Sequence, residues 1–265
     1  LLQSDWPNVI KDGFDVGIND KNYLDDIRII NGVALSASDI SDNFDSVVTE
    51  LVLDMPTNGS HGSGNIIDLS PTPHVISSSG AINDANHKIA GNASAWSGSG
   101  SISVGADEDW IFQATDEFTV DAWIRTKNGF FDVVEALPVS IGGPTPWRLG
   151  LDNGLATFTF RGDFLKFQDN IRIDDGAWHH LVLSQRMQPS TLAVLYVDGV
   201  NVQQLGGRGD PYPINYVRMG DNGHIDELRI LKGRALTEAE VQLEYNAYMT
   251  DDVVLLLSGG RTLSP

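Results

Sequence analysis

Alternating hydrophobic and polar positions dominate the middle of the chain. β-branched and aromatic residues are concentrated in four stretches, FTVDAWIR (Phe118–Arg125), ATFTF (Ala156–Phe160), HHLVLS (His179–Ser184) and LAVLYVDG (Leu192–Gly199). Turn sequences such as KNG, DNG, DDG and VDG lie between or at the ends of these stretches. This pattern predicts short β-strands joined by tight turns.

Two segments have a helical pattern instead. One is Leu236–Tyr248, in which Thr237 and Glu240 have the spacing of a capping box. The other is Ala34–Phe44, which Ser36 caps. Many short strands with so little helix predict an all-β fold, an antiparallel two-sheet β-sandwich.

The pattern near the start of the chain returns near its end. DDIRIINGVALSASDI begins at Asp25 and DELRILKGRALTEAEV begins at Asp226, and aligning Arg28 with Arg229 gives an offset of 201 residues. We therefore expect the end of one copy in residues 1–48, a complete copy in residues 49–248, and the first strand of another in residues 249–265. On this interpretation the chain is either a window on a tandem array or a subunit whose ends fall inside domains.

Three blocks of the complete copy carry a family resemblance. They are Trp96–Arg125 (WSGSGSISVGADEDWIFQATDEFTVDAWIR), Asp174–Val200 (DDGAWHHLVLSQRMQPSTLAVLYVDGV) and Met219–Val241 (MGDNGHIDELRILKGRALTEAEV). In this order they resemble the laminin-G-like jelly-roll domains of the concanavalin A-like lectin/glucanase superfamily. The tandem type of such domains occurs on bacterial surface and phage virion proteins.

The resemblance implies a fold and a range of roles. The expected fold is a jelly roll of two antiparallel sheets, with the first and last strands adjacent and a short helix after the last strand of each copy. The expected role is structural or adhesive, in a larger surface, fibre or virion-exposed protein that assembles head-to-tail and binds glycan. A dedicated carbohydrate-binding module is the alternative, and a glycoside hydrolase is the more distant one.

Composition narrows the class of partners. The chain has 265 residues, no cysteine and a net charge of −19. Such a charge disfavours nucleic acid and anionic lipid, and the lack of cysteine excludes disulfides and thiolate metal sites. No apolar run is long enough to span a membrane. We expect an extracellular, cell-surface or virion-surface location, with copies of itself, adjacent repeats or cell-surface glycan as partners.

The resemblance also implies a calcium site. Its candidate ligands here are Asp68 and Asp226, because hard cations prefer carboxylate and carbonyl oxygens. Ser97 stands where the family has an aspartate, and Gly100–Ile102 replaces the family's G-D-Y. One acidic group often found near that calcium is therefore missing, and calcium is the only cofactor that we expect.

Aromatic and acidic side chains suggest a glycan site. Trp147 follows a proline-containing loop and is expected to be exposed, while Asp121, Trp123 and Arg125 share one face of a predicted strand. The alternative for Trp123, and for Trp178, is packing inside the sandwich.

Catalysis is not expected. The E-x-D-x-x-E strand of the family's glucanases is absent, and only Glu117 and Asp121 could share a face. His179 and His180 are adjacent in a strand and point to opposite faces, so they cannot chelate one ion.

Some short motifs and one apolar run complete the candidates. Asn58 and Asn92 lie in N-glycosylation sequences, and RGD occurs at Arg208–Asp210. The most apolar run is Val253, Val254, Leu255, Leu256 and Leu257. Because an isolated apolar strand is an aggregation hazard, we expect this strand to complete a sandwich by strand addition. The alternative is that it simply continues into the next copy of a longer chain.

Overall fold

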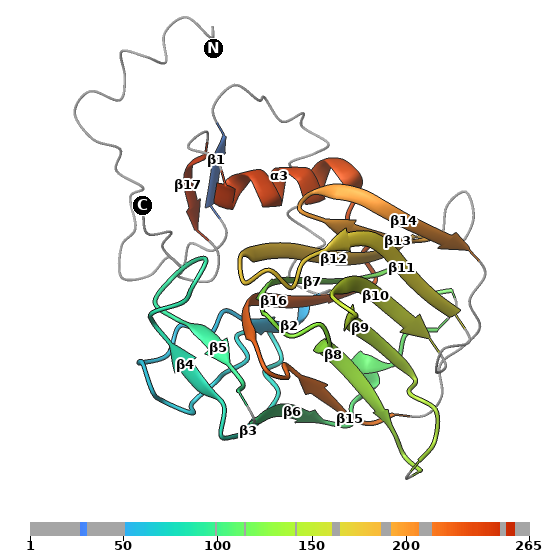
Figure 1. The fold of residues 1–265 in the computed structure, drawn as a ribbon, viewed down its shortest axis with the longest axis horizontal. Coiled ribbons are helices and arrows are strands. Elements are labelled where there is room, and N and C mark those ends of the chain that lie inside the picture. The colour runs from blue at the N-terminus through green and yellow to red at the C-terminus, as the bar shows by residue number, and fades with distance from the viewer. Residues whose placement is uncertain are drawn as a thin grey trace, which may run out of the picture.

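In the residues that the structure describes, the protein is a two-layer β-sandwich with the helix α3 (Glu238–Met249) packed outside it (Figure 1). This computed structural model describes residues 27–30, 51–98, 100–113, 115–140, 142–160, 165–186, 192–206, 214–249 and 253–257. No helix in these ranges has the length and apolar character needed to cross a membrane.

One layer is an eight-stranded antiparallel sheet. Its strands run in the order β14-β13-β12-β7-β16-β5-β4, and β2 pairs with β16. Their bounds are β2 Leu51–Met55, β4 Ile82–Asp84, β5 Ser94–Trp96, β7 Phe118–Arg125, β12 Trp178–Arg186, β13 Leu192–Val197, β14 Val200–Gly206 and β16 His224–Lys232.

The other layer is a seven-stranded antiparallel sheet. Its order is β11-β10-β9-β8-β15-β6-β3. The bounds are β3 Ile76–Ser79, β6 Ser101–Gly105, β8 Phe131–Pro138, β9 Trp147–Asp152, β10 Leu155–Phe160, β11 Leu165–Arg172 and β15 Ile214–Met219. A short 3-10 helix, η1 (Glu108–Trp110), follows β6.

The main core lies between the two sheets. Its members include alternate residues of β7, namely Phe118, Val120, Ala122 and Ile124, all at most 1% exposed. They pack with inward residues of the other layer, such as Phe158. Because alternate strand residues point to opposite faces, one apolar set per strand closes the sandwich.

The helix α3 (Glu238–Met249) covers the outer face of the eight-stranded sheet. Thr237 Oγ1 accepts from the Glu240 N–H at 3.3 Å, and Glu240 Oε2 accepts from the Thr237 N–H at 2.7 Å. This is the capping box that the sequence predicts. Beneath and beside the helix lies a second, smaller core of Val182, Val194, Tyr196, Leu231, Leu236 and Val241.

The main predictions of the fold are confirmed. The expected strand Phe118–Arg125 is β7, and the three other expected strands lie within β10, β12 and β13, except that β13 ends at Val197. The expected adjacency of first and last strands is present as the pairing of β2 with β16. The expected helix Ala34–Phe44 lies outside the described residues, and the division into three copies stays a prediction.

The pairing of β1 (Ile27–Ile30) with β17 (Val253–Leu257) repeats that of β16 with β2. Both pairs are antiparallel, and both carry a register shift near their ends. The shift falls between Ile29 and Ile30 in one pair and between Ile230 and Leu231 in the other. In β1 and β16 these positions are 201 residues apart, which is the offset of the sequence repeat.

Candidate functional site

A row of polar side chains crosses the outer face of the seven-stranded sheet. Cross-strand partners lie on the same face of a sheet, and here six successive strands contribute one polar residue each. The row is Ser77, Ser103, Arg218, Glu135, Arg148 and Thr159. In the described part of the chain, no helix covers this face, in contrast to the other layer.

Ion pairs fix the charged members of this row. Arg218 Nη2 donates to Glu135 Oε2 at 2.6 Å and to Asp132 Oδ2 at 3.1 Å. Arg148 pairs with Asp132 through Nε and donates to the Leu151 carbonyl at 2.8 Å. Two carboxylates and two guanidinium groups thus hold one another in place, and their charges balance.

A hollow of about 430 Å³ lies beside this network. It is lined by Ser101, Ser103, Tyr216 and Arg218. Tyr216 is 38% exposed, so its ring face is available to a ligand. Hydroxyls, a guanidinium and an aromatic ring therefore meet in one place.

Glu135 is the most perturbed carboxyl of this face. Burial raises the pKa of Glu135, and the neighbouring Asp132 raises it further, while Arg218 acts in the opposite direction. A buried carboxyl is expected to respond in this way.

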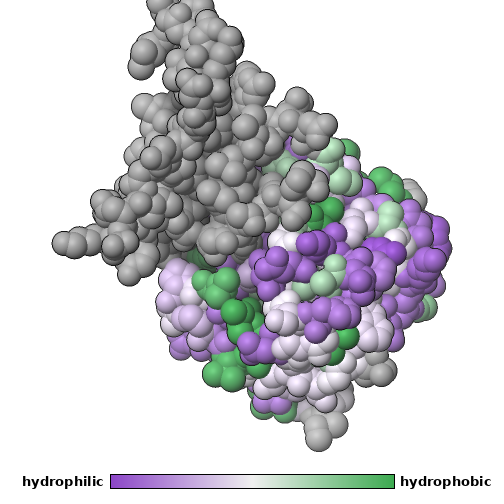
Figure 2. All heavy atoms as spheres, turned by 90° about the vertical axis from the view of Figure 1, so that its left-hand side faces the viewer, coloured by the Kyte–Doolittle hydropathy of each residue, from purple (hydrophilic) through white to green (hydrophobic). Residues whose placement is uncertain are grey.

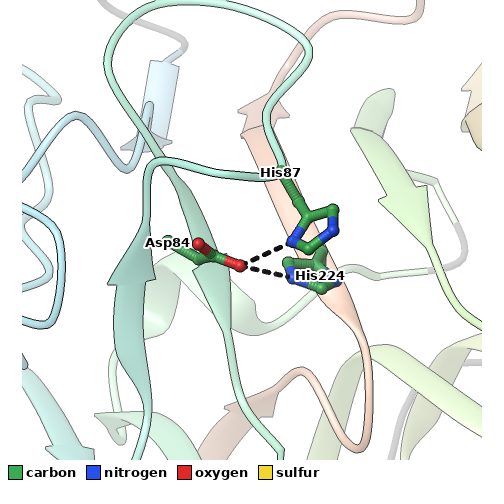
Figure 3. Close-up of side chains that lie close together, drawn as sticks. All are labelled: Asp84, His87 and His224. Atoms are coloured by element: carbon green, nitrogen blue, oxygen red, sulfur yellow. Dashed lines mark hydrogen bonds and ion pairs between the residues drawn. The ribbon is translucent and has the colours of Figure 1, made fainter.

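A second polar cluster surrounds Asp84 at the end of β4. His87 Nδ1 lies 2.8 Å and His224 Nε2 lies 3.1 Å from the same oxygen, Asp84 Oδ2. Figure 3 shows the carboxylate facing both imidazole rings, one from the loop after β4 and one from β16. Burial raises the pKa of Asp84, but hydrogen bonds from His87, the Asn86 N–H and His224 more than offset it, so that the pKa lies below its usual range.

The tryptophans predicted to bind glycan are buried. The expectation of an exposed Trp147 is wrong, because its side chain is 1% exposed and its Nε1 donates to the Trp110 carbonyl at 3.0 Å. Trp123 is also 1% exposed and stacks on His180 and Tyr245. For Trp123 the packing alternative is correct.

Asp121, the acidic member of the predicted glycan site, is also buried, with 2% of its surface exposed. α3 covers it, and its carboxylate pairs with His180 at 2.7 Å and with Arg229. Burial opposes ionisation, but Arg229 and His180 hold the pKa of Asp121 well below its usual range. Arg125 is partly exposed at the end of β7.

The two predicted calcium ligands are buried and engaged with the protein. Asp68 accepts from the backbone N–H groups of Asp54, Ser70 and His74 at 2.8–3.0 Å. Asp226 accepts from Thr57 Oγ1 at 2.9 Å and from the Ile89 N–H at 2.9 Å. Among the described residues, no group of three converging His, Asp or Glu ligand atoms includes either carboxylate. Calcium binding at this pair stays a prediction.

The remaining candidates fall partly outside the described residues. Arg208–Asp210 and its RGD motif do so entirely. Asn58 and Asn92 lie together, since Asn58 Oδ1 accepts from the Asn92 N–H at 2.6 Å. Glu117 and Asp121 form no catalytic pair, because Asp121 is held under the helix.

The ion pairs of Arg218 with Asp132 and Glu135 were not predicted from the sequence, because β8 contains a β-bulge. Asp132 and Glu135 are three residues apart, which places them on opposite faces of a regular strand. The register of β8 against β9 shifts between Asp132 and Val134, so both carboxylates reach Arg218. The alternation of polar and apolar residues does not predict such a bulge.

The face on the left-hand side of Figure 1 carries both polar and apolar residues. Figure 2, which views the left side of Figure 1, shows polar and apolar residues interspersed, with green apolar groups gathered in small patches. The largest exposed fractions of apolar side chains are those of Val75 at 85% and Val139 at 60%.

Two solved structures of toxin binding domains are similar to this chain. The binding domain of Paraclostridial Mosquitocidal Protein 1 has a TM-score of 0.60 at 20% identity, with 76% of this chain and 53% of that chain covered. The binding domain of botulinum neurotoxin DC, solved in complex with rat synaptotagmin II, has a TM-score of 0.58 at 12% identity, covering 77% and 52%. At these identities the likeness establishes the fold alone.

A sequence relative and a family model agree with these structures. Paraclostridial mosquitocidal protein 1 of Paraclostridium bifermentans is 25% identical over 179 residues, which are 58% of this chain and 14% of that protein. The chain thus spans about half of the solved binding domains and a small part of the whole relative. A laminin-G-type model, described as concanavalin A-like lectin/glucanases superfamily, matches residues 96–242. Because this match covers more than half of the chain, the protein belongs to the concanavalin A-like lectin/glucanases superfamily.

Proposed function

We propose that the chain is a non-enzymatic recognition module that binds a neutral glycan on the outer face of the seven-stranded sheet. The observation that carries this proposal is the ion-paired row beside the hollow lined by Ser101, Ser103, Tyr216 and Arg218. Saccharides are bound through such groups, because hydroxyls exchange hydrogen bonds with charged side chains and sugar C–H faces pack on aromatic rings.

Charge balance favours a neutral ligand. Arg148 and Arg218 are each paired with a carboxylate, and the whole chain carries a net charge of −19. An anionic saccharide would approach against this field, whereas a neutral one meets donors and acceptors side by side.

The same ion pairs argue against hydrolysis. A glycosidase needs one carboxyl free to protonate the leaving oxygen and a second free to attack or to activate water. Here Arg218 holds both Asp132 and Glu135, and Arg148 holds Asp132 as well. These carboxylates are placed to hold a ligand.

The similar toxin domains support a binding role outside the cell. They are named as binding domains, and that of botulinum neurotoxin DC was solved both with rat synaptotagmin II and with SialylT. By this analogy we place the chain in a larger secreted protein that acts at a cell surface.

A glycan array with the purified, untagged chain tests the proposal. We expect binding to neutral saccharides, with no release of new reducing ends from them. Arg218→Ala should weaken binding about tenfold or more, since a charge-assisted hydrogen bond is worth about 1.5–3 kcal/mol. Tyr216→Ala, which leaves the ion pairs intact, should weaken binding by removing the aromatic face. Arg172→Ala, which removes an exposed pair with Asp174, is the matched control. The proposal would be contradicted if Arg218→Ala and Tyr216→Ala both bound as the wild type does, or if the chain bound no neutral saccharide.

A structural role is the second candidate, and the pairing of β1 with β17 favours it. This pair and the pair of β16 with β2 are both antiparallel, and the register shift lies at positions of β1 and β16 that are 201 residues apart. If the same pairing forms between chains, it joins copies head-to-tail by strand addition.

Sedimentation of the chain with and without residues 253–265 tests this role. Strand addition predicts concentration-dependent multimers for the full chain and a monomer for the truncated one. A full chain that stays monomeric at its highest soluble concentration would contradict it.

A further inference from the structure

Half of the histidines of the chain lie close to Asp84. The chain has six histidines, and three of them, His61, His87 and His224, lie within 3.4 Å of this one carboxylate. They come from three separate segments: the loop after β2, the loop after β4 and the first residue of β16. The fold therefore assembles this cluster from positions far apart in the sequence.

The geometry of the cluster is close to that of a tetrahedral metal site. The facing atoms of Asp84, His87 and His224 all lie within 4.8 Å of one another. With metal–ligand bonds of about 2.0–2.1 Å, a tetrahedral ion separates its ligand atoms by roughly 3.4 Å. The distances of 2.8 and 3.1 Å from Asp84 Oδ2 to the two ring nitrogens need only a small side-chain rotation to reach that value.

Packing holds the ligands in place but leaves the cluster reachable. The side chain of His224 is 12% exposed, with the rings of Trp96 and Trp178 at centroid distances of 6.4 and 6.2 Å. Asp84 is also 12% exposed and accepts from the Asn86 N–H at 2.9 Å. The side chain of His87 is 43% exposed, so an ion can enter from that side.

The two other groups of converging donors already have structural roles. In the group of Asp121, His180 and Glu244, both carboxylates pair with the guanidinium of Arg229, and His180 pairs with Asp121. In the group of His74, Asp107 and Asp109, Asp107 caps η1 and His74 Nδ1 faces Asp68 at 3.0 Å. Among the three groups in the described residues, the Asp84 cluster differs from the other two. It has two imidazoles that face one shared carboxylate, and it has no ion pair with Lys or Arg.

We propose that Asp84, His87 and His224 form a binding site for a divalent ion of the zinc class, with a fourth position open to water or to a ligand group. Two imidazole nitrogens and one carboxylate oxygen suit Zn²⁺, Co²⁺ or Ni²⁺. They do not suit Ca²⁺ or Mg²⁺, which require mostly oxygen ligands. His61 serves as an outer partner, because its Nδ1 lies 3.4 Å from Asp84 Oδ1 and accepts from the Ala85 N–H at 3.2 Å.

Metal titration of the untagged chain tests this site. After treatment with a chelator, the chain is titrated calorimetrically with Zn²⁺, and with Co²⁺ while visible absorption is recorded. We expect one ion per chain, a tetrahedral Co²⁺ spectrum and a raised melting temperature. A chain that takes up no Zn²⁺ overturns the proposal.

Variants locate the bound ion. His87→Gln lies on a partly exposed loop and His224→Gln on β16, and each should weaken Zn²⁺ binding about tenfold or more, since each removes one of three protein ligands. His179→Gln removes an imidazole held by a separate carboxylate, Asp198, and should leave Zn²⁺ binding unchanged. Circular dichroism checks that each variant is folded. If His224→Gln is unfolded, the Zn²⁺ affinity of His87→Gln alone tests the location of the ion.

Two results would overturn the assignment. One is Zn²⁺ uptake that is the same in wild type and folded His87→Gln, because the ion would then sit elsewhere. The other is a Ca²⁺ affinity that matches that for Zn²⁺ and is lost in His87→Gln, because the site would then belong to the oxygen-preferring class.

Discussion

Single imidazole–carboxylate contacts recur through the structure, and His179 shows their consequence most simply. Its Nδ1 lies 2.8 Å from Asp198 and its Nε2 lies 3.2 Å from Asp175. Burial lowers the pKa of His179, but the hydrogen bonds and charges of these two carboxylates outweigh it and raise the pKa overall. The protonated form is therefore favoured by folding.

The raised pKa of His179 predicts a pH-dependent stability. Protonation of His179 stabilises the fold fully below the unfolded pKa of about 6.5, and this contribution is lost as the pH rises through the folded pKa. We expect His179→Gln to cost about 1 kcal/mol of unfolding free energy at acidic pH and less at alkaline pH. Urea denaturation at pH 5.5 and 8.5 (about one unit or more on either side of that pKa) measures the difference. A cost that is the same at both values would contradict this account.

Trp147 gives a second prediction for a single residue. Its side chain is 1% exposed and packs against Phe112 in the main core. Trp147→Ala should therefore lower the unfolding free energy by about 3–5 kcal/mol, as for other large aromatic truncations. Thermal denaturation checks this, and a loss below about 1 kcal/mol would mean that the site is not a packed core.

At the scale of elements, one ion-pair network fastens α3 to the sheet. Arg229 of β16 donates to Asp121 of β7 and to Glu244 of α3, the latter at 2.6 Å. Asp121 is 2% exposed and Glu244 is 8% exposed, so both charges depend on this guanidinium. The network joins two strands and the helix in one unit.

Breaking this network should be costly. Arg229→Met leaves two carboxylates buried without their cation, and we expect a loss of about 3–5 kcal/mol of unfolding free energy. Arg172→Ala removes a pair whose arginine side chain is 63% exposed and should cost less than about 1 kcal/mol. Urea unfolding of both variants gives the comparison, and equal costs would show that burial does not set the strength of the network.

The elements themselves were largely predictable from the sequence. The alternation of apolar and polar residues predicted β7, and the capping box of Thr237 and Glu240 predicted the start of α3. Packing of Trp123 was one of the two alternatives from the sequence, but the burial of Asp121 was not predicted, because it depends on Arg229 and on a helix more than a hundred residues later. The ion pairs around Arg218 were not predictable either, because they depend on a bulge in β8. The Asp84 cluster was not predictable because it brings together residues that are distant in the sequence.

The two layers of the whole molecule differ in what lies outside them. α3 and its small apolar core close the eight-stranded sheet, whereas the described outer face of the seven-stranded sheet presents paired charges, hydroxyls and Tyr216. A module with one closed and one polar face is suited to bind on the polar one. The net charge of −19 adds selectivity by disfavouring anionic ligands on the rest of the surface.

The location of a bound neutral saccharide is the most direct test of this account. Amide NMR spectra of the labelled chain are recorded while the best neutral saccharide from the glycan array is added. We predict that the largest shift changes fall on Ser101, Ser103, Tyr216 and Arg218, around the hollow of the seven-stranded sheet. Shift changes confined to the opposite layer, or to loops away from this face, would contradict the account.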